Sequence, residues 1–336
     1  MLMRMNVIRG RSSIDRILGR RLRRPAVAIG NFDGVHRGHQ ALIATARRMA
    51  GNAADKTAVG GHPDGDGAGP GEVVALTFDP HPARLFAPAL APPLITTLER
   101  RAELLGEAGA DIVIIEPFTA ALAAVEAEAF ARDVLAGDLG AAHVVVGYDF
   151  SFGRGRRGDT AALEAFGARF GFGVSIVRRV SVHGLTCSST KVREFVLEGR
   201  VEGAEVLLGR PFEIAGEVTR GAARGRAIGF PTANIRPEAE LLPRPGIYAA
   251  RAHLDAPVDG GATRPAALSI GTNPTFTDDG ALTVEAYLLD FEGDLYGQRL
   301  RLDVIHRLRD ERRFDSVEAL VAQIHADVAR TRELCA

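Results

Sequence analysis

Residues 26–46 read AVAIGNFDGVHRGHQALIATA, and this stretch decides the fold of the first half of the chain. The apolar run Ala26–Ile29 predicts a buried parallel strand that ends at Gly30. Leu42 and Ala46 recur at helical spacing, so a helix is expected after the loop. A strand, a loop and a helix in this order bring backbone N–H groups and the positive end of the helix dipole to the loop, where anions bind.

Two imidazoles stand at the start of that expected helix. His36 and His39 are three residues apart, which predicts that they share one face of the entering turn. Gly38 between them leaves room for a phosphate to approach the backbone. This arrangement indicates transfer at a phosphorus atom. The plain alternative is an incidental surface or core pair, and a zinc site is disfavoured because no Cys, Asp or Glu stands beside them at ligand spacing.

Composition excludes several classes of protein. A chain of 336 residues with 46% hydrophobic residues is long enough for two domains. With 41 basic and 42 acidic residues the formal net charge is −1, so neither nucleic acid nor a membrane is an expected partner. The two cysteines are far apart in the sequence and fit a reducing, cytoplasmic compartment. Neither a signal peptide nor a membrane-spanning helix is expected.

Strands and helices alternate through the first half. Apolar runs predict further strands at Val73–Phe78, Asp111–Ile115, Val144–Val146 and Val174–Val177. Helical patterns are found at Thr97–Ala108, Ala121–Ala136, Thr160–Phe170 and, as a connection, 194–208. This alternation predicts a parallel α/β sheet, which binds ligands outside the carboxyl ends of its strands.

Two segments of the first half carry no such pattern. Arg16–Arg24 is rich in arginine and is interpreted as part of a solvated face in residues 1–24. Residues 51–71 are rich in Gly, Ala and Asp and are interpreted as a mobile insertion.

The second half has a different texture. Short strand-like runs separated by Gly, Pro and Asp predict an antiparallel barrel or sandwich; they are Ile214–Val218, Gly246–His253, Ala266–Ile270, Thr283–Leu289 and Leu300–Leu308. An amphipathic helix is expected at Val317–Cys335, with Ser316 as its cap.

An ordered set of motifs runs through both halves. In the first half these are GNFDGVHRGH (30–39), TFDPHP (77–82), GYDFSFG (147–153) and SSTKVR (188–193). In the second they are GAARGRAIGFPTAN (221–234), GIY (246–248), IGTNPTF (270–276) and DLYG (294–297). The set resembles the bifunctional bacterial riboflavin kinase/FAD synthetase family over nearly the whole chain.

The resemblance implies both architecture and activity. Residues 1–207 would form a Rossmann-like nucleotidyltransferase domain that adenylylates FMN with ATP, giving FAD and pyrophosphate. Residues 208–336 would form a six-stranded antiparallel β-barrel with a terminal helix that phosphorylates riboflavin with ATP. The implied small-molecule partners are ATP, riboflavin and FMN, and Mg²⁺ is the implied cofactor. A chain with kinase activity alone and a flavin-binding regulator are the competing interpretations.

In the first half, His36 and His39 would hydrogen-bond the phosphate oxygens on which charge develops. The resemblance assigns nucleotide binding to Gly30, Phe32, Asp33, Gly38, Ser188, Ser189, Thr190 and Arg193. It assigns flavin binding to His81, Asp149 and Phe152. Spacing alone leaves helix capping open for the Ser-Ser-Thr run, and an ordinary turn for the three flavin candidates.

In the second half, the loop Gly221–Gly229 would fold over the nucleotide as a lid. The nucleotide-binding residues implied here are Gly221, Arg224, Gly229 and Pro231. Thr232 and Asn234 alternate along an extended segment and offer neutral oxygens for Mg²⁺. Glu285 matches the base that accepts the proton of the ribityl hydroxyl. By pattern alone, Arg224 fits a solvated surface, Thr232 and Asn234 fit a turn, and Glu285 fits a solvent-facing strand position.

Overall fold

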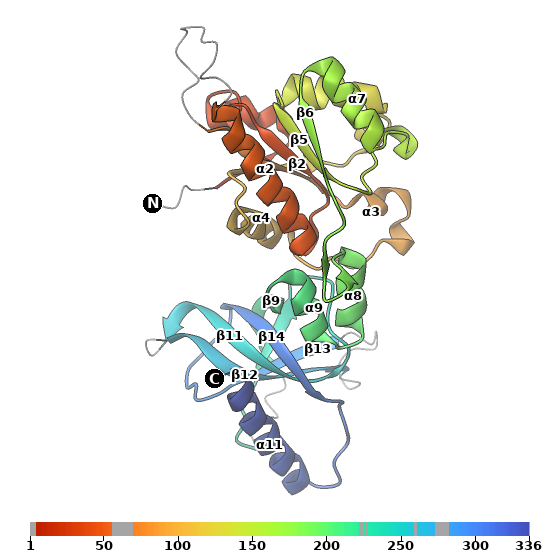
Figure 1. Ribbon diagram of the computed structural model, residues 1–336. Coiled ribbons are helices and arrows are strands. Elements are labelled where there is room, and N and C mark those ends of the chain that lie inside the picture. Colours follow the sequence, from red (N-terminus) through yellow and green to blue (C-terminus); the bar gives the residue numbers. More distant parts are fainter. Residues whose placement is uncertain are drawn as a thin grey trace. The chain divides into compact units, whose positions relative to one another are not determined.

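The structure is a computed structural model that describes residues 5–55, 70–221, 225, 228–258, 261–272 and 282–335. The chain divides into two compact units. Met1–Pro92 and Leu98–Cys187 form the first, and Pro93–Thr97 and Ser188–Ala336 form the second. The first unit is built around a parallel sheet and the second around a barrel (Figure 1).

The sheet of the first unit has six strands in the order β1-β4-β3-β2-β5-β6, and every neighbouring pair is parallel. The strands are β1 (Asn6–Arg9), β2 (Ala26–Ile29), β3 (Val73–Asp79), β4 (Ile112–Pro117), β5 (His143–Gly147) and β6 (Gly173–Val177). The predicted parallel α/β sheet is therefore confirmed. A small hairpin, β7 (Ser181–Val182) and β8 (Leu185–Thr186), follows it.

Helices cover both faces of this sheet. Apolar residues of α2 (Arg37–Asp55) and α4 (Leu98–Glu107) pack on one face. The other face packs against α1 (Ile14–Leu18), η4 (Phe130–Asp138) and α7 (Thr160–Phe170). Alternate residues of one strand enter the two cores, since Ala28 lies in the first and Val27 in the second. Short helices α3 (Pro82–Phe86), η3 (Pro88–Leu90), α5 (Ala120–Ala123), α6 (Ala127–Ala129), η1 (Arg11–Ser13) and η5 (Arg154–Arg156) complete the unit.

The order of the strands reverses between β2 and β5. From β2 the chain adds β3 and β4 on one side, whereas β5 and β6 lie on the other. Such a switch point opens a crevice at the carboxyl ends of the two strands, which is where ligands bind in open α/β sheets. The loop carrying His36 and His39 follows β2, and Asp149 follows β5.

Sequence analysis misses a strand in the N-terminal segment. Arg16–Arg24 is exposed or half-buried, as expected, but β1 forms the edge of the sheet against β4 and Ile14 is buried. The strand escapes sequence analysis because Ile8 is its one buried side chain, so it shows no apolar run.

Two predicted helices are wrong in their extent. Ala121–Ala136 is divided into α5, α6 and the π-helix η4, in which the Leu139 N–H donates to the Val134 carbonyl five residues before it. The connection 194–208 is two helices, α8 (Ser189–Leu197) and α9 (Val201–Leu208). They separate at Gly199, whose φ of 76° ends the first helix.

The predicted insertion 51–71 begins later than expected. Residues 51–55 continue α2, which is longer than its apolar pattern indicates. Residues 56–69 lie outside the described part of the chain. Among the described helices, none is long and apolar enough to cross a membrane.

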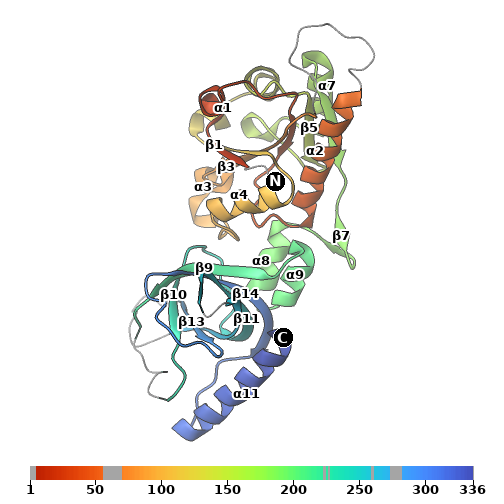
Figure 2. The ribbon, with the colours of Figure 1, turned by 90° about the vertical axis from the view of Figure 1, so that its left-hand side faces the viewer.

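The second unit contains a closed antiparallel barrel in the order β10-β13-β12-β11-β14-β9, and Figure 2 shows its strands in a ring. The strands are β9 (Phe212–Thr219), β10 (Ala233–Pro237), β11 (Gly246–Val258), β12 (Gly261–Thr272), β13 (Leu282–Leu288) and β14 (Arg299–Arg309). The six-stranded barrel and the terminal helix α11 (Val317–Cys335) are confirmed. Alternate side chains such as Tyr248, Leu268 and Leu302 fill the interior.

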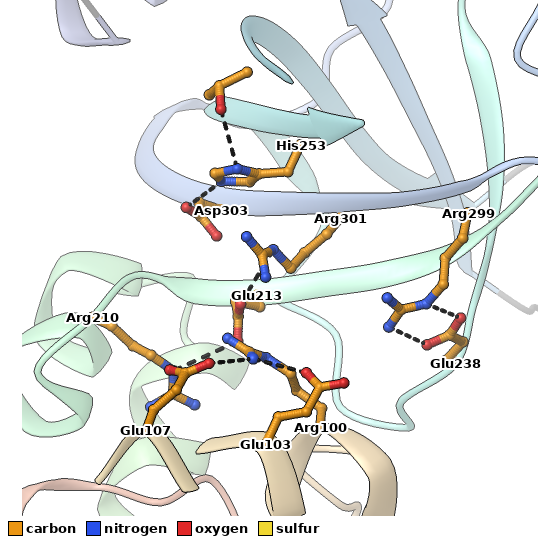
Figure 3. A network of polar contacts seen from close by, with 11 residues as sticks. Arg100, Glu103, Glu107, Arg210, Glu213, Glu238, His253, Arg299, Arg301 and Asp303 are labelled. Atoms are coloured by element: carbon orange, nitrogen blue, oxygen red, sulfur yellow. Dashed lines mark hydrogen bonds and ion pairs between the residues drawn. The ribbon is translucent and has the colours of Figure 1, made fainter. Parts of the chain in front are cut away.

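Polar pairs join neighbouring strands on the outside of the barrel (Figure 3). His253 of β11 contacts Asp303 of β14 at 2.7 Å, and Arg301 of β14 contacts Glu213 of β9 at 3.5 Å. The alternation therefore sends apolar residues inward and leaves the outer surface for charged groups.

Candidate functional site

The loop between β2 and α2 has an unusual backbone. Phe32 and Val35 have φ angles of 51° and 42°, and Gly34 between them has 80°. Left-handed conformations are rare for valine and phenylalanine, because the Cβ approaches the backbone. Both side chains are buried in the core, and that burial stabilises the strained loop.

This loop stacks the two predicted histidines. The rings of His36 and His39 lie 3.7 Å apart between centroids, with their planes inclined by 19°. Because α2 begins at Arg37, His36 immediately precedes the helix, and its ring lies on the same side of the entering turn as that of His39, as predicted. The His36 Nδ1 accepts hydrogen bonds from the N–H groups of Gly38 (3.1 Å) and His39 (3.4 Å). A neutral His36 therefore carries its proton on Nε2, where it can donate.

His39 is held as a neutral imidazole. Burial, the adjacent His36 and the positive charge of Arg101 lower the pKa of His39 well below its ordinary value. The edge of its ring meets Phe32, 5.2 Å away between centroids. Its Nδ1 is buried and has no hydrogen-bond partner among the described residues. The His39 ring thus stays uncharged at neutral pH, at the amino end of α2.

Gly38 lies against a side chain of its own loop. A Cβ added there would lie 2.9 Å from Cε1 of His36 and 3.3 Å from the Cys187 carbonyl oxygen. A larger residue at this position would therefore have to displace the His36 ring.

A buried ion pair supports the loop from behind. Nη2 of Arg101, from α4, lies 3.4 Å from Oδ1 of Asp33. Sequence analysis predicts Arg101 only as part of the helix Thr97–Ala108, because no local motif includes this residue. The signal that could find it is an arginine on an otherwise apolar face, since a buried cation requires an anionic partner.

Three more predicted residues, Gly30, Phe32 and Asp33, belong to the same loop after β2. The Gly30 N–H donates to the Leu76 carbonyl at 3.2 Å, which continues the ladder of β2 and β3. Phe32 and Asp33 are almost completely buried, so they support the loop from inside and do not face solvent.

The three flavin candidates have different surroundings. His81 caps α3, since its Nδ1 accepts from the Ala83 N–H at 3.2 Å, and its Nε2 lies 3.2 Å from the side-chain amide of Asn31. Asp149 is exposed just after β5. Phe152 is buried in the core and stacks on Phe150, with 5.4 Å between ring centroids.

The Ser-Ser-Thr run belongs to the second unit. Ser188 caps α8 by accepting from the Lys191 N–H at 3.2 Å, so the capping alternative describes this residue. Ser189 and Thr190 form the first turn of the helix. Arg193 is buried, and its Nε donates to the Pro93 carbonyl at 2.7 Å.

Three candidate residues of the barrel do come together. Thr232 Oγ1 donates to Oε2 of Glu285 at 3.2 Å. Asn234 of β10 stands directly opposite Glu285 of β13 in the ladder. Glu285 is half-buried on the outer side of the barrel, while its neighbours Val284 and Ala286 point inward. A hydroxyl, an amide and a carboxylate thus form one polar cluster on the outer side of the barrel wall.

Gly221, just after β9, lies against this cluster. A Cβ added at Gly221 would lie 2.2 Å from Nδ2 of Asn234, so only glycine fits against that amide. Gly229 has a φ of 88° and, like Pro231, is exposed. Phe230 between them is buried and meets the rings of Tyr287 and His325 edge-on. Arg224 lies outside the described residues.

Comparison with known proteins identifies both units. The family model described as FAD synthetase matches residues 20–64 and 68–191, and the one described as riboflavin kinase matches residues 208–335. The bifunctional riboflavin kinase/FMN adenylyltransferase of Pseudomonas fluorescens is 39% identical over 92% of each chain. The chain belongs to the bifunctional riboflavin kinase/FMN adenylyltransferase family.

Other members of this family agree. The riboflavin kinase/FMN adenylyltransferase of Listeria monocytogenes is 37% identical over 91% of each chain, and that of Escherichia coli is 36% identical over 91% of each. A solved structure described as a macrolide-efflux protein from Streptococcus pneumoniae has a TM-score of 0.79, with 29% identity over 98% of this chain and 99% of its own. Family membership makes the chain an enzyme of flavin cofactor biosynthesis with two transferase activities.

Proposed function

We propose that residues 1–207 transfer an adenylyl group from ATP to FMN and that residues 208–336 phosphorylate riboflavin with ATP. The stacked imidazoles of His36 and His39 at the amino end of α2, of which that of His39 is neutral, support the first reaction most strongly. A helix N-terminus already favours a polyphosphate, and the two rings add directional donors there. Both cysteines, Cys187 and Cys335, are buried and free, which supports a cytoplasmic location.

In adenylyl transfer, a phosphate oxygen of FMN attacks the α-phosphorus of ATP. The new P–O bond forms as the bond to the bridging oxygen breaks, and pyrophosphate leaves with the electron pair. His36 and His39 donate hydrogen bonds to the oxygens that gain charge, with no covalent intermediate. A neutral imidazole such as His39 suits this role because it has one N–H to donate and adds no charge that must be desolvated.

The other residues of the first site bind or support the substrates. Gly30 and Gly38 allow the loop backbone to pass close to the nucleotide, whereas Phe32 and Asp33 act from the core side. Ser189, Thr190 and Arg193 would meet the ATP phosphates at the start of α8, where Ser188 fixes the helix end. His81 and Asp149 would contact the flavin substrate, and Phe152 would hold the turn that bears Asp149.

In the kinase reaction, Glu285 takes the proton of the ribityl 5′-hydroxyl. The oxygen then attacks the γ-phosphorus of ATP, and ADP leaves. Thr232 and Asn234 would hold Mg²⁺ with ATP, and their oxygen donors together with Glu285 fit this hard cation. When bound, Mg²⁺ neutralises the phosphate charge. The Thr232 hydroxyl can bind Mg²⁺ through its oxygen lone pairs while it donates its hydrogen to Glu285. Gly221, Arg224, Gly229 and Pro231 would line the phosphates.

Replacing Gly38 by alanine is expected to slow FMN adenylylation about 10- to 100-fold, because the new methyl group displaces the His36 ring. Initial rates of FAD formation from FMN and ATP measure the effect. Gly51→Ala is the matched control on the same helix, since no atom of the described residues lies within 4 Å of a Cβ there. Equal rates for Gly38→Ala and the unsubstituted chain would refute the geometric argument.

Gly221→Ala is expected to disturb the kinase alone. The added Cβ would overlap the Asn234 amide, so riboflavin phosphorylation should fall about 10- to 100-fold and need more Mg²⁺. Titration of the kinase rate with Mg²⁺ measures this, and FAD formation from supplied FMN is the internal control. An unchanged Mg²⁺ dependence would contradict the role of Asn234.

A product assay tests the function as a whole. The purified chain is incubated with riboflavin, ATP and Mg²⁺, and FMN and FAD are separated by chromatography. FMN followed by FAD is the expected sequence of products. FMN alone would mean a kinase with an inactive first domain, and tight flavin binding with no product would mean a regulator.

A further inference from the structure

The ion pair behind the histidine loop has an unusually dry environment. The side chains of Arg101 and Asp33 expose 3% and 1% of their surface. Charges removed from water to this degree persist only when they are paired, because each alone loses its hydration without compensation. The pair joins α4 to the loop between β2 and α2, so it links a rigid element to the segment that carries both histidines.

Arg101 also acts on His39 through its charge. Two neighbours that titrate or carry charge lower the pKa of His39 in addition to burial: His36, which stacks on the ring, and Arg101 from α4. Asp33 is the anionic partner of that arginine. Protonation of His39 would put an N–H on both ring nitrogens, including Nδ1, which has no acceptor among the described residues. Geometry and charge therefore both oppose an imidazolium at this position.

We propose that Arg101 is a positioning residue for adenylyl transfer, which fixes the histidine loop through its buried ion pair with Asp33. The proposal rests on the proposed function of the histidine pair. It does not require Arg101 to touch a substrate. The arginine acts through two other residues, with its guanidinium on the Asp33 carboxylate and its positive charge on the His39 ring.

The test compares two substitutions in the full-length enzyme. Arg101→Met removes both the charge and the planar guanidinium, whereas Arg101→Lys keeps the charge and loses the guanidinium geometry. With methionine the pKa of His39 should rise toward its ordinary value, so the neutral ring is lost as pH falls and the acidic limb of the pH–rate profile moves to higher pH. We expect kcat/KM for FMN adenylylation to fall at least about 10-fold at pH 8 and further at pH 6.

The lysine variant separates position from charge. Its kcat/KM should also fall at pH 8, but its acidic limb should stay where it is in the unsubstituted enzyme. NMR titration of the His39 ring gives the same information without turnover. Arg100→Met is the matched control: Arg100 is the preceding residue on α4, and it pairs with Glu103 and Glu107 of its own helix at 2.9 Å each (Figure 3). It should leave the titration of His39 unchanged.

The double variant Asp33→Asn/Arg101→Met guards against a simple folding defect, because it removes both buried charges together. If it restores the rate and pH profile while Arg101→Met alone is impaired, Arg101 only neutralises Asp33 and the proposal is wrong. Unchanged rates in Arg101→Met would also overturn it. If His39→Ala itself retains adenylylation, the proposed function of the pair fails instead.

Discussion

Replacing His39 by alanine is expected to lower the rate of FMN adenylylation about 10²- to 10³-fold, the usual effect of removing one donor to a developing oxyanion. The ring is stacked on His36 at the amino end of α2 and is neutral, so its loss removes a prepared N–H and leaves the helix intact. Riboflavin phosphorylation should continue. With riboflavin, ATP and Mg²⁺ the variant should therefore accumulate FMN and form almost no FAD.

His143→Ala is the matched control for that experiment. His143 is the first residue of β5, at the amino ends of the parallel strands, and its Nε2 lies 2.9 Å from the Ser175 hydroxyl oxygen. Its replacement should leave FAD formation near the level of the unsubstituted enzyme. If His39→Ala forms FAD as fast as His143→Ala does, His39 has no part in the transfer.

Glu285→Gln is expected to reduce riboflavin phosphorylation about 10²- to 10⁴-fold, because an amide cannot accept the hydroxyl proton. The substitution preserves the shape of the cluster, since the Thr232 hydroxyl can still donate to the amide oxygen. Adenylylation of supplied FMN should remain unchanged. ADP released with riboflavin and FAD formed from FMN are measured on the same preparation.

Glu217→Gln serves as its control, because Glu217 lies on β9 of the same barrel and pairs with Arg236 across the ladder. An exposed pair of this kind contributes little to stability, so kinase turnover should be close to normal. Equal kinase rates in the Glu217 and Glu285 variants would remove the carboxylate from the mechanism.

Much of the fold follows from the sequence, because it rests on strong local patterns. The apolar run Ala26–Ile29 and the periodic apolar residues of α2 are signals that tertiary contacts reinforce. The helix Thr160–Phe170 agrees with its predicted bounds, since Asp159 caps it and Gly171 ends it in the left-handed region. The roles expected of Thr232 and Glu285 depended on the family resemblance, because spacing alone allowed a turn and a solvent-facing carboxylate, and their contact is seen only in the structure.

The features that sequence patterns miss are those set by distant contacts. The edge strand β1 has one buried residue and is defined by its pairing with β4. The left-handed conformation of Val35 opposes its intrinsic preference and persists because its side chain enters the core. Arg101 lies 68 positions from Asp33, so only the packing of α4 reveals their pairing.

Closure of the barrel has a consequence for how this unit can associate with other chains. Each of the six barrel strands, including the short β10, pairs with a neighbouring strand on both sides, so the described ring has no edge strand. Another polypeptide would have to displace a strand to enter this ring by β-augmentation. Any binding partner of its wall must recognise side chains.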